Sequence, residues 1–261
     1  MSLLLASGGS IESHLKDTYI WGRFFSAHHV LMAAVGGIMI YGFWKLAQRT
    51  KGAESAPKGL GGLVEVTLVW VRDEIVYPWL GPERGRQYLY FFWTLFFFIL
   101  LSNLIGLLPV PLNPWGKTAT GNISVTAALA LITFVMVQVS GMKQHGWGKY
   151  WLHIVPGGIP TALWPLMWLV EFIGLFTKPF ALTVRLFANM TGGHAIMAVL
   201  GGFFLGVAHY ANPIIGGAVS VATLGFALFI MLFETLVALI QAYIFTVLSA
   251  IFVSLAVAEE H

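Results

Sequence analysis

The chain contains no cysteine and few charged residues. Of its 261 residues, only 10% are Asp, Glu, Lys or Arg, whereas 58% are hydrophobic. The lack of thiols excludes disulfides, thiol catalysis and cysteine-based metal sites. A soluble domain usually carries about 25% charged residues. Scarce charge combined with long apolar runs therefore predicts a polytopic membrane protein.

Nucleotide and haem sites are also missing from the sequence pattern. No GxxxxGK[ST] phosphate-binding loop is present, so we expect no site for ATP hydrolysis in this chain. Among the eight histidines, only His194 lies in the middle of an apolar segment, whereas a bis-histidine haem needs two such residues on facing helices. We therefore expect no cofactor and no metal site, and no nucleic-acid partner.

The apolar segments predict an all-α fold with about five membrane-crossing helices in a single membrane domain. One stretch is interrupted by charges at Glu65, Arg72, Asp73 and Glu74, which predicts an amphipathic helix at the membrane interface. The expected elements are an outer N-terminal segment at 1–26, a span at 27–47, the interfacial helix at 60–80, a helical hairpin formed by 87–110 and 122–142, and a last helical hairpin at 159–258.

The last hundred residues are almost free of charge and turns. Asn212-Pro213 is the one clear break. As one helix, Pro213–Ala258 would be about 69 Å long, against about 30 Å of hydrocarbon. Its middle holds no proline or polar turn, which favours one long, strongly tilted helix over a helix that folds back. We expect the same of residues 160–208.

Lysine and arginine in the loops set the expected orientation. Residues 48–86 and the loop at 143–149 carry most of them, whereas the turn at 109–120 has only Lys117. Cytoplasmic loops are enriched in these residues. With five crossings, the pattern predicts an N-terminus outside and a C-terminus in the cytoplasm.

Arg185 is the most costly residue of the last apolar region. An arginine at the bilayer centre costs roughly 2.5–3.5 kcal/mol on insertion scales, and it cannot escape this cost by deprotonating. It must therefore face protein, water or a partner. A structural ion pair inside a helix bundle is the alternative to a functional role.

Polar residues near Arg185 fall on two faces of a helix. Glu171, Lys178 and Arg185 are seven residues apart and Asn189 follows four residues later, so they share one stripe. His194 lies nine residues after Arg185, about 180° around the helix. We therefore expect His194 to address a different neighbour from Arg185.

The final segment carries polar residues that match these two faces. Glu234 and Gln241 are seven residues apart. Two antiparallel helices that meet at 212–213 would bring Glu234 to the depth of His194, and Gln241 to the depth of Arg185. A titratable His–Glu pair suits proton transfer across a membrane. A buried polar pair without a transport role is the alternative.

Small side chains are concentrated in the same helix, where they would let another helix approach closely. Ordinary glycine enrichment of transmembrane helices is the alternative explanation. These residues are Ala188, Gly192, Gly193, Ala195, Ala198, Gly201 and Gly202.

Three motifs resemble subunit a of F-type ATP synthases. They are LVEFIGLFTKPFALTVRLFANMTGGH at 169–194, FETLVALIQAYIFTVLSAIF at 233–252 and LSNLIGLLP at 101–109. The resemblance covers roughly residues 85–258. It implies the non-catalytic stator subunit of a proton-transporting, rotary ATP synthase. Two offset half-channels would connect the two sides of the membrane to the buried carboxylates of a c-subunit ring, and the other partners would be b-type peripheral stalk subunits and the remaining synthase subunits.

The resemblance also implies roles for the matching residues. Arg185 would face the ring carboxylate, with Asn189 and Gln241 beside it. Glu171 matches the acidic position of the cytoplasmic half-channel, and the His194–Glu234 pair matches the opposite half-channel. Two further residues, Lys178 and Asn103, are candidates for supporting roles.

Two positions depart from the family pattern. Many bacterial members carry Glu at the position of His194 and His at the position of Glu234, whereas here the two are exchanged, as in mitochondrial relatives. Gly106 stands where some relatives carry an acid, so the role of that acid is not expected to carry over.

Two other classes compete with this interpretation. A secondary transporter that binds a small anion at Arg185 would typically show inverted repeats, which the sequence does not display. A structural membrane scaffold leaves the cost of Arg185 unexplained. We expect a multi-pass protein of a bacterial plasma membrane, with the mitochondrial inner membrane as the alternative location.

Overall fold

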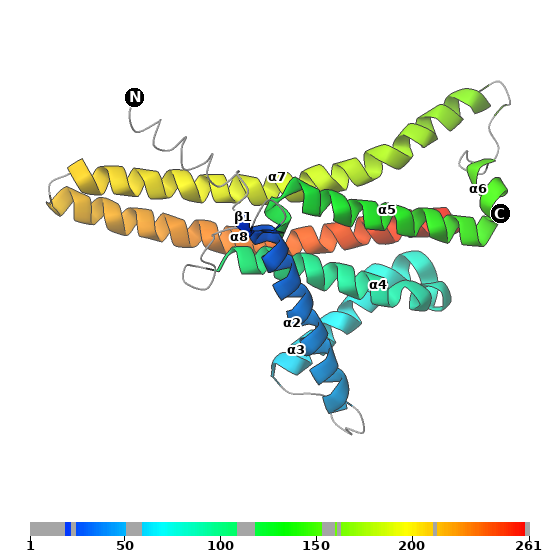
Figure 1. Cartoon of the computed structure of the whole chain (residues 1–261), viewed down its shortest axis with the longest axis horizontal. Coiled ribbons are helices and arrows are strands. Elements are labelled where there is room, and N and C mark those ends of the chain that lie inside the picture. Colours follow the sequence, from blue (N-terminus) through cyan, green and yellow to red (C-terminus); the bar gives the residue numbers. More distant parts are fainter. Residues whose placement is uncertain are drawn as a thin grey trace. The chain divides into compact units, whose positions relative to one another are not determined.

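The computed structural model describes residues 19–21, 25–50, 59–108, 118–152, 160, 163–210 and 213–258, and these residues are almost entirely helical (Figure 1). The expectations for the turns at 109–117 and 211–212, and for most of the N-terminal segment, lie outside the described residues. Within them, β1 (Tyr19–Trp21) pairs antiparallel with β2 (Phe25–Ser26). This small ladder was not expected from the sequence.

The helices of membrane length follow one another in the expected order, whereas the short helix α6 forms in the segment that was expected to be a loop. In chain order the elements are α2 (Ala27–Thr50), α3 (Leu60–Trp70), the π-helical turn η1 (Val71–Val76), α4 (Tyr77–Gly106), the 3-10 turn η2 (Ala119–Gly121), α5 (Ile123–His145), α6 (Trp147–Leu152), α7 (Trp164–Tyr210) and α8 (Pro213–Val257). Among the described residues, five helical runs are long and apolar enough to cross a membrane. The predicted all-helical, polytopic fold is thereby confirmed. Tilt, interfacial position and orientation refer to a membrane and remain predictions.

The last two helices are long and continuous. α8 is one helix of 45 residues, and α7 is one helix of 47 residues that continues through Pro179. At 1.5 Å per residue each is about 70 Å long. The missing turn signal in the middle of α8 thus correctly favoured a single helix over one that folds back.

Residues 60–106 are helical on both sides of a kink at Gly81, so the expected interfacial helix leads into the next span without a long loop. The first helical part passes from α3 through η1 into the start of α4, and the kink follows at Gly81, whose backbone is not helical and whose φ of 71° lies in the left-handed region. Glycine adopts this conformation without steric cost, so the chain changes direction without a connecting loop. Within η1, the Arg72 guanidinium donates two hydrogen bonds to the Asp73 carboxylate, at 2.7 and 3.0 Å. This neutralises two of the four interrupting charges.

The chain divides into two compact units, each described here by itself. The first comprises 1–37, 99–122 and 186–241, and the second comprises 38–98, 123–185 and 242–261. In the second unit, the end of α8 is tied to the bend of α4. Ser254 Oγ donates to the Trp79 carbonyl at 2.6 Å, and the Arg84 guanidinium donates to the Val257 carbonyl at 3.2 Å. A cation at the carboxyl end of a helix also complements the helix dipole.

An elbow between α5 and α6 is fixed by local hydrogen bonds, also in the second unit. Gly146, with φ of 82°, ends α5, and its amide donates to the Met142 carbonyl at 2.9 Å, as in a left-handed helix cap. The phenol of the buried Tyr150 donates to Gln138 Oε1. Burial raises the pKa of the Tyr150 phenol above its usual value, which keeps it a neutral donor.

We predict that Tyr150→Phe loosens this elbow. The change leaves the buried Gln138 amide without its partner, which is expected to cost about 1–3 kcal/mol. Because the folded-state pKa of Tyr150 is raised, its contribution is present below its unfolded pKa of about 10 and is lost as the pH rises through its folded-state pKa. Thermal unfolding of the purified chain in detergent should show a lower midpoint for the variant at neutral pH. Between neutral and alkaline pH, the unfolding midpoint of the variant should also fall less than that of the parent chain. Equal midpoints at neutral pH would show that the hydrogen bond from Tyr150 to Gln138 does not stabilise the fold.

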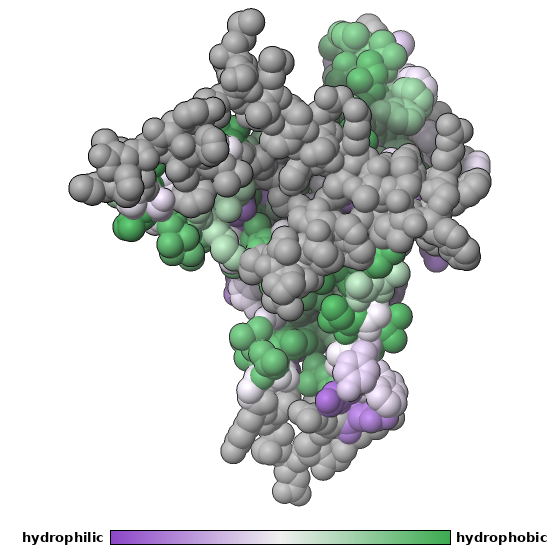
Figure 2. Space-filling view, turned by 60° about the vertical axis from the view of Figure 1, so that its left-hand side comes forward, coloured by the Kyte–Doolittle hydropathy of each residue, from purple (hydrophilic) through white to green (hydrophobic). Residues whose placement is uncertain are grey.

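The described surface is largely apolar. Hydrophobic side chains dominate the coloured atoms in Figure 2, and exposed large hydrophobic residues occur on all of the membrane-length helices, for example Ile40, Tyr90, Leu131, Phe180 and Leu232. Soluble monomers rarely expose such extensive apolar surface. The distribution agrees with a chain whose solvent is lipid or neighbouring membrane helices.

Candidate functional site

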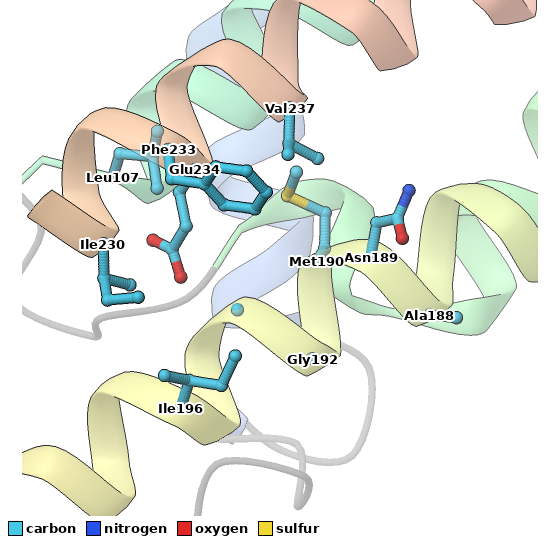
Figure 3. A pocket seen from close by; sticks show the side chains of 11 residues that line it. Leu107, Ala188, Asn189, Met190, Gly192, Ile196, Ile230, Phe233, Glu234 and Val237 are labelled. Carbon is cyan, nitrogen blue, oxygen red and sulfur yellow. The ribbon is translucent and has the colours of Figure 1, made fainter.

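The first unit contains a cavity of about 270 Å³ between α7 and α8. Its walls are mainly apolar, and Asn189 and Glu234 supply its polar side chains. Leu107, at the end of α4, closes part of it. Figure 3 shows the Glu234 carboxylate directed from α8 toward the turn of α7 that carries Gly192, with Asn189 further along α7. Two of the predicted site residues therefore line one cavity.

The carboxylate of Glu234 lies directly against Gly193. A Cβ placed on Gly193 would lie 3.0 Å from Glu234 Cδ and 3.3 Å from Cγ, and closer still to Oε1. No such obstacle exists at Gly192, where an added Cβ meets nothing within 4 Å. The predicted close approach at the small residues is thus found at Gly193. The neighbouring Gly192, together with Gly201 and Gly202, has no such contact.

One oxygen of the Glu234 carboxylate lacks a hydrogen-bond partner among the described residues. Its Oε1 atom is buried and accepts no hydrogen bond from any described group. The hydroxyl of Thr191, on the same turn of α7 as Gly193, is likewise buried without a partner in the described part of the chain. Buried carboxylate and hydroxyl oxygens normally have hydrogen-bond partners. The cavity beside Glu234 is therefore one of the places in the first unit where a further hydrogen-bonding group would meet an unpaired buried atom.

His194 cannot be placed beside Glu234 from the structure. Its backbone belongs to α7, but its side chain lies outside what the structure describes. The His194–Glu234 pair therefore stays a prediction. Gly193 precedes His194 in the chain and contacts Glu234, so the backbone next to His194 is close to the carboxylate.

Asn103 lies in a second polar region of the first unit, where its side chain is fully buried. Thr120 Oγ1 donates to Asn103 Oδ1 at 2.7 Å, and His28 Nδ1 lies 2.8 Å from the Thr118 carbonyl. Gly106 packs against Thr118 so closely that an added Cβ would lie 3.2 Å from the Thr118 Cα and would overlap its side chain. No side chain is accommodated at Gly106, in agreement with the expectation that an acid has no role there. Asn103 does not line the cavity, and its supporting role stays a prediction.

Arg185 belongs to the second unit and is exposed. Its guanidinium has no hydrogen bond, ion pair or ring contact with any described residue. The preceding Val184 is exposed as well, at 40%, so the cation lies on an apolar surface. The alternative of an ion pair inside the helix bundle finds no support among the described residues.

The other candidates on the same stripe are partly buried. The Lys178 ammonium lies over the ring of Phe252, 5.4 Å from its centroid, within the second unit. Glu171 is half-buried, and the two form no ion pair within the described chain. Gln241 is buried, at 4% exposed, and lies in the first unit. Its predicted pairing with Arg185 joins residues of the two units and stays a prediction.

The cavity-lining residues that sequence reasoning did not single out are apolar. Met190, Phe233 and Val237 give the cavity its apolar wall. Their spacing along α7 and α8 is that of any buried helix face, so the sequence contained no signal that separated them from ordinary core residues. Among the described residues, no group of three or more His, Cys, Asp or Glu side chains is arranged to hold a metal ion.

Comparison with known proteins identifies the family. Residues 29–254 match the family described as ATP synthase A chain. The chain is 46% identical over 254 residues to ATP synthase subunit a of Chloroherpeton thalassium, covering 95% of this chain and 71% of the relative. It is 41% identical over 237 residues to the subunit of the same name from Myxococcus xanthus, covering 89% of this chain and 73% of the relative. A match that extends over most of the chain, through α7 and α8, confirms the resemblance of the three motifs. The chain belongs to the ATP synthase A chain family.

Proposed function

We propose that this chain is the stationary proton-conducting subunit of a rotary F-type ATP synthase. The observation that carries the proposal is the unpartnered Arg185, exposed on an apolar surface of α7. A permanent cation in such a place needs a counter-charge from outside the chain. A membrane-buried carboxylate on each subunit of a rotating c-ring supplies that charge and passes Arg185 in turn.

Arg185 would control the protonation state of the passing carboxylate. A carboxyl group has to be neutral to face lipid, whereas an opposite charge within about 4–6 Å favours its ionised form. The carboxylate therefore gives up its proton on one side of Arg185 and takes up another on the other side before it returns to lipid. Asn189 is also exposed, four residues along α7, and its amide would donate to the same anion.

Two offset half-channels would connect this position to the two sides of the membrane. The cavity of Glu234 and Asn189 would belong to one of them, because it combines a carboxylate with room for water. His194 would exchange protons with Glu234, and Gln241 would lie near Arg185. Glu171 would serve the opposite, cytoplasmic half-channel, with Lys178 and Asn103 in supporting roles.

The chain would not hydrolyse ATP itself. Proton-motive force would bias the rotation of the ring, and other subunits of the complex would use that rotation for ATP synthesis. Peripheral stalk subunits of the b type would hold the chain stationary against the ring. The named relatives given above are bacterial, which supports a bacterial plasma membrane with the N-terminus outside and the C-terminus in the cytoplasm.

Isolation of the complex tests the proposal. A tagged full-length chain, extracted in mild detergent, is expected to co-purify with a ring of a small, two-helix proteolipid in a fixed ratio. Vesicles that contain the complex should acidify on ATP addition. Isolation of the chain without any ring, together with uptake of a small anion by vesicles that contain it alone, would favour an anion transporter instead.

The contact between Gly193 and Glu234 provides a prediction with a matched control. Gly193→Ala is expected to push the Glu234 side chain out of its position, since the added methyl group would overlap it. Gly192→Ala adds the same methyl group where nothing lies within 4 Å, so it should be nearly silent. Misplacing a group that transfers protons is expected to slow transfer by roughly tenfold to a hundredfold.

Passive proton flux through complexes stripped of their ATP-hydrolysing sector measures this effect. Both variants have to assemble to the same level, which immunoblotting of purified membranes checks. Equal flux in the two variants would show that the position of Glu234 against Gly193 is unimportant for proton transfer.

A further inference from the structure

We propose that Leu107 limits the access of water to the Glu234 carboxylate, and that Asn103, Thr118 and Thr120 are positioning residues that hold Leu107 in place. The inference deepens the proposed function, because it rests on Glu234 being the group that exchanges protons in this cavity. It assigns an apolar barrier to the cavity and a definite role to Asn103. The contacts that carry it all lie within the first unit.

Leu107 is the lining residue that comes from a third element. The other described lining residues belong to α7 and α8, whereas Leu107 directly follows Gly106, the last residue of α4. Figure 3 shows it on the same side of the cavity as Phe233 and Glu234. Its side chain is half-buried, so it is part of the wall and also partly exposed. An apolar side chain in such a place opposes the entry of water, as hydrophobic constrictions do in channels.

The cavity is poised between a wet and a dry state. Its volume of about 270 Å³ is enough for several water molecules. One oxygen of Glu234 is buried without a partner among the described residues, which favours hydration, whereas the apolar walls oppose it. The balance is therefore sensitive to a single apolar side chain in the wall.

The end of α4 packs closely against the turn that contains η2. At Gly106 an added Cβ would lie 3.2 Å from the Thr118 Cα and would overlap the Thr118 side chain. Three residues earlier on α4, the fully buried Asn103 accepts a hydrogen bond from Thr120 Oγ1 at 2.7 Å. Thr118 and Thr120 are themselves fully buried. The last turn of α4 is therefore fixed by one close contact and one hydrogen bond.

Two further contacts hold the same region. His28 Nδ1 lies 2.8 Å from the Thr118 carbonyl, so the start of α2 also reaches this turn. The Leu107 amide donates to the Leu104 carbonyl at 3.1 Å, which tightens the end of the helix. Because Leu107 follows Gly106 directly, the position of its side chain depends on all of these contacts.

Thiol reactivity at position 234 tests the proposal. The chain has no cysteine, so Glu234→Cys introduces a single thiol into the cavity. The complex with this change is placed in nanodiscs, where both membrane surfaces are open to aminoethyl methanethiosulfonate, which reacts with a thiolate in water. Mass spectrometry of the chain then gives the modification rate. Adding Leu107→Ala should raise this rate severalfold.

The assay measures access and requires no proton transfer. Its outcome therefore stands apart from the flux measured with Glu234→Gln. If the flux proves independent of Glu234, the proposed function fails and the access result can still hold. If access proves independent of Leu107, the inference fails and the proposed function can still hold.

Control variants separate the loss of Leu107 from a general loosening of the fold. Leu108→Ala removes the same atoms from the next residue, which is exposed and does not line this cavity, so the rate should stay unchanged. Leu107→Met keeps a similar volume and should keep the slow rate. A thiol at Gly148, where an added side chain meets nothing within 4 Å, should react equally with and without Leu107→Ala.

Thr120→Val tests the positioning role. Valine has a similar shape but cannot donate to Asn103, so the modification rate should rise, by less than in Leu107→Ala. The two changes together should give the rate of Leu107→Ala alone, because Thr120 acts through Leu107. Thr133→Val is the matched control, since it removes the hydroxyl of another buried threonine, which bonds to the Leu129 carbonyl in its own helix.

Three results would overturn the proposal. Equal rates in Leu107→Ala and Leu108→Ala would show that Leu107 does not limit access. An unchanged rate in Thr120→Val would remove the positioning role. A rate that rises further when Thr120→Val is added to Leu107→Ala would show that Thr120 acts on the fold in general and not through Leu107.

Discussion

Replacing Arg185 by alanine is expected to abolish proton-driven ATP synthesis in membranes that contain this chain. The variant loses the exposed guanidinium on the apolar surface of α7. In the proposed mechanism, a ring carboxylate without an adjacent positive charge would no longer be favoured in its ionised form as it passes this chain. Synthesis driven by an imposed pH gradient and membrane potential should fall to the background of membranes that lack the complex.

The same variant is expected to conduct protons without coupling. A fixed positive charge repels protons that would otherwise pass directly between two half-channels. Its removal should increase the passive proton flux in the absence of nucleotide. This separates loss of control from simple failure to assemble, because a complex that does not assemble would conduct less and not more.

Two control variants test whether the position of the charge matters. Arg86→Ala removes an exposed arginine from α4 and should preserve synthesis. Arg185→Lys keeps the charge but loses the planar, multiply donating guanidinium, so we expect a partial defect that lies between the parent and Arg185→Ala. Normal ATP-driven proton pumping by Arg185→Ala would refute the assignment.

The fold was largely predictable because the bilayer restricts it strongly. A membrane span needs about 20 apolar residues with all backbone groups bonded internally. The length of an apolar run and its turn signals therefore locate the helices. The continuity of α8 followed from one missing signal, since no proline or polar turn interrupts its middle. The kink at Gly81 follows directly after the predicted interfacial helix at 60–80, whereas the continuation into α4 without a loop was not predicted, because a glycine looks the same in a loop.

The polar residues at the cavity and on the α7 surface were recognisable from the sequence, but their packing was not. Charges inside an apolar segment are costly, so Arg185 and Glu234 were recognisable from the sequence. The sequence did not predict which glycine contacts the Glu234 carboxylate, because Gly192 and Gly193 are adjacent and identical in type. The choice depends on the face of α7 against which α8 packs, and this is settled by contacts between residues about forty positions apart. The hydrogen bond between Tyr150 and Gln138 was not predicted, because nothing in a single sequence indicates that a given tyrosine and glutamine are in contact.

Replacing Glu234 by glutamine is expected to slow proton transfer through the complex by roughly a hundredfold, the lower end of what a positioned proton-transfer group contributes. Glutamine has nearly the same shape, so the packing against Gly193 and the cavity should persist. It does not titrate, so a proton can no longer be held at this position. The defect should therefore appear in flux and not in assembly.

Proton flux into vesicles at a fixed membrane potential measures this directly. Glu83→Gln makes the same chemical change at an exposed carboxylate of α4 and should leave the flux unchanged. Glu234→Asp keeps a titratable carboxylate that is one methylene shorter, so we expect partial recovery relative to Glu234→Gln. If Glu234→Gln and Glu83→Gln conduct equally, then Glu234 is a packing residue of the cavity, and protons reach Arg185 by a route that does not use its carboxylate.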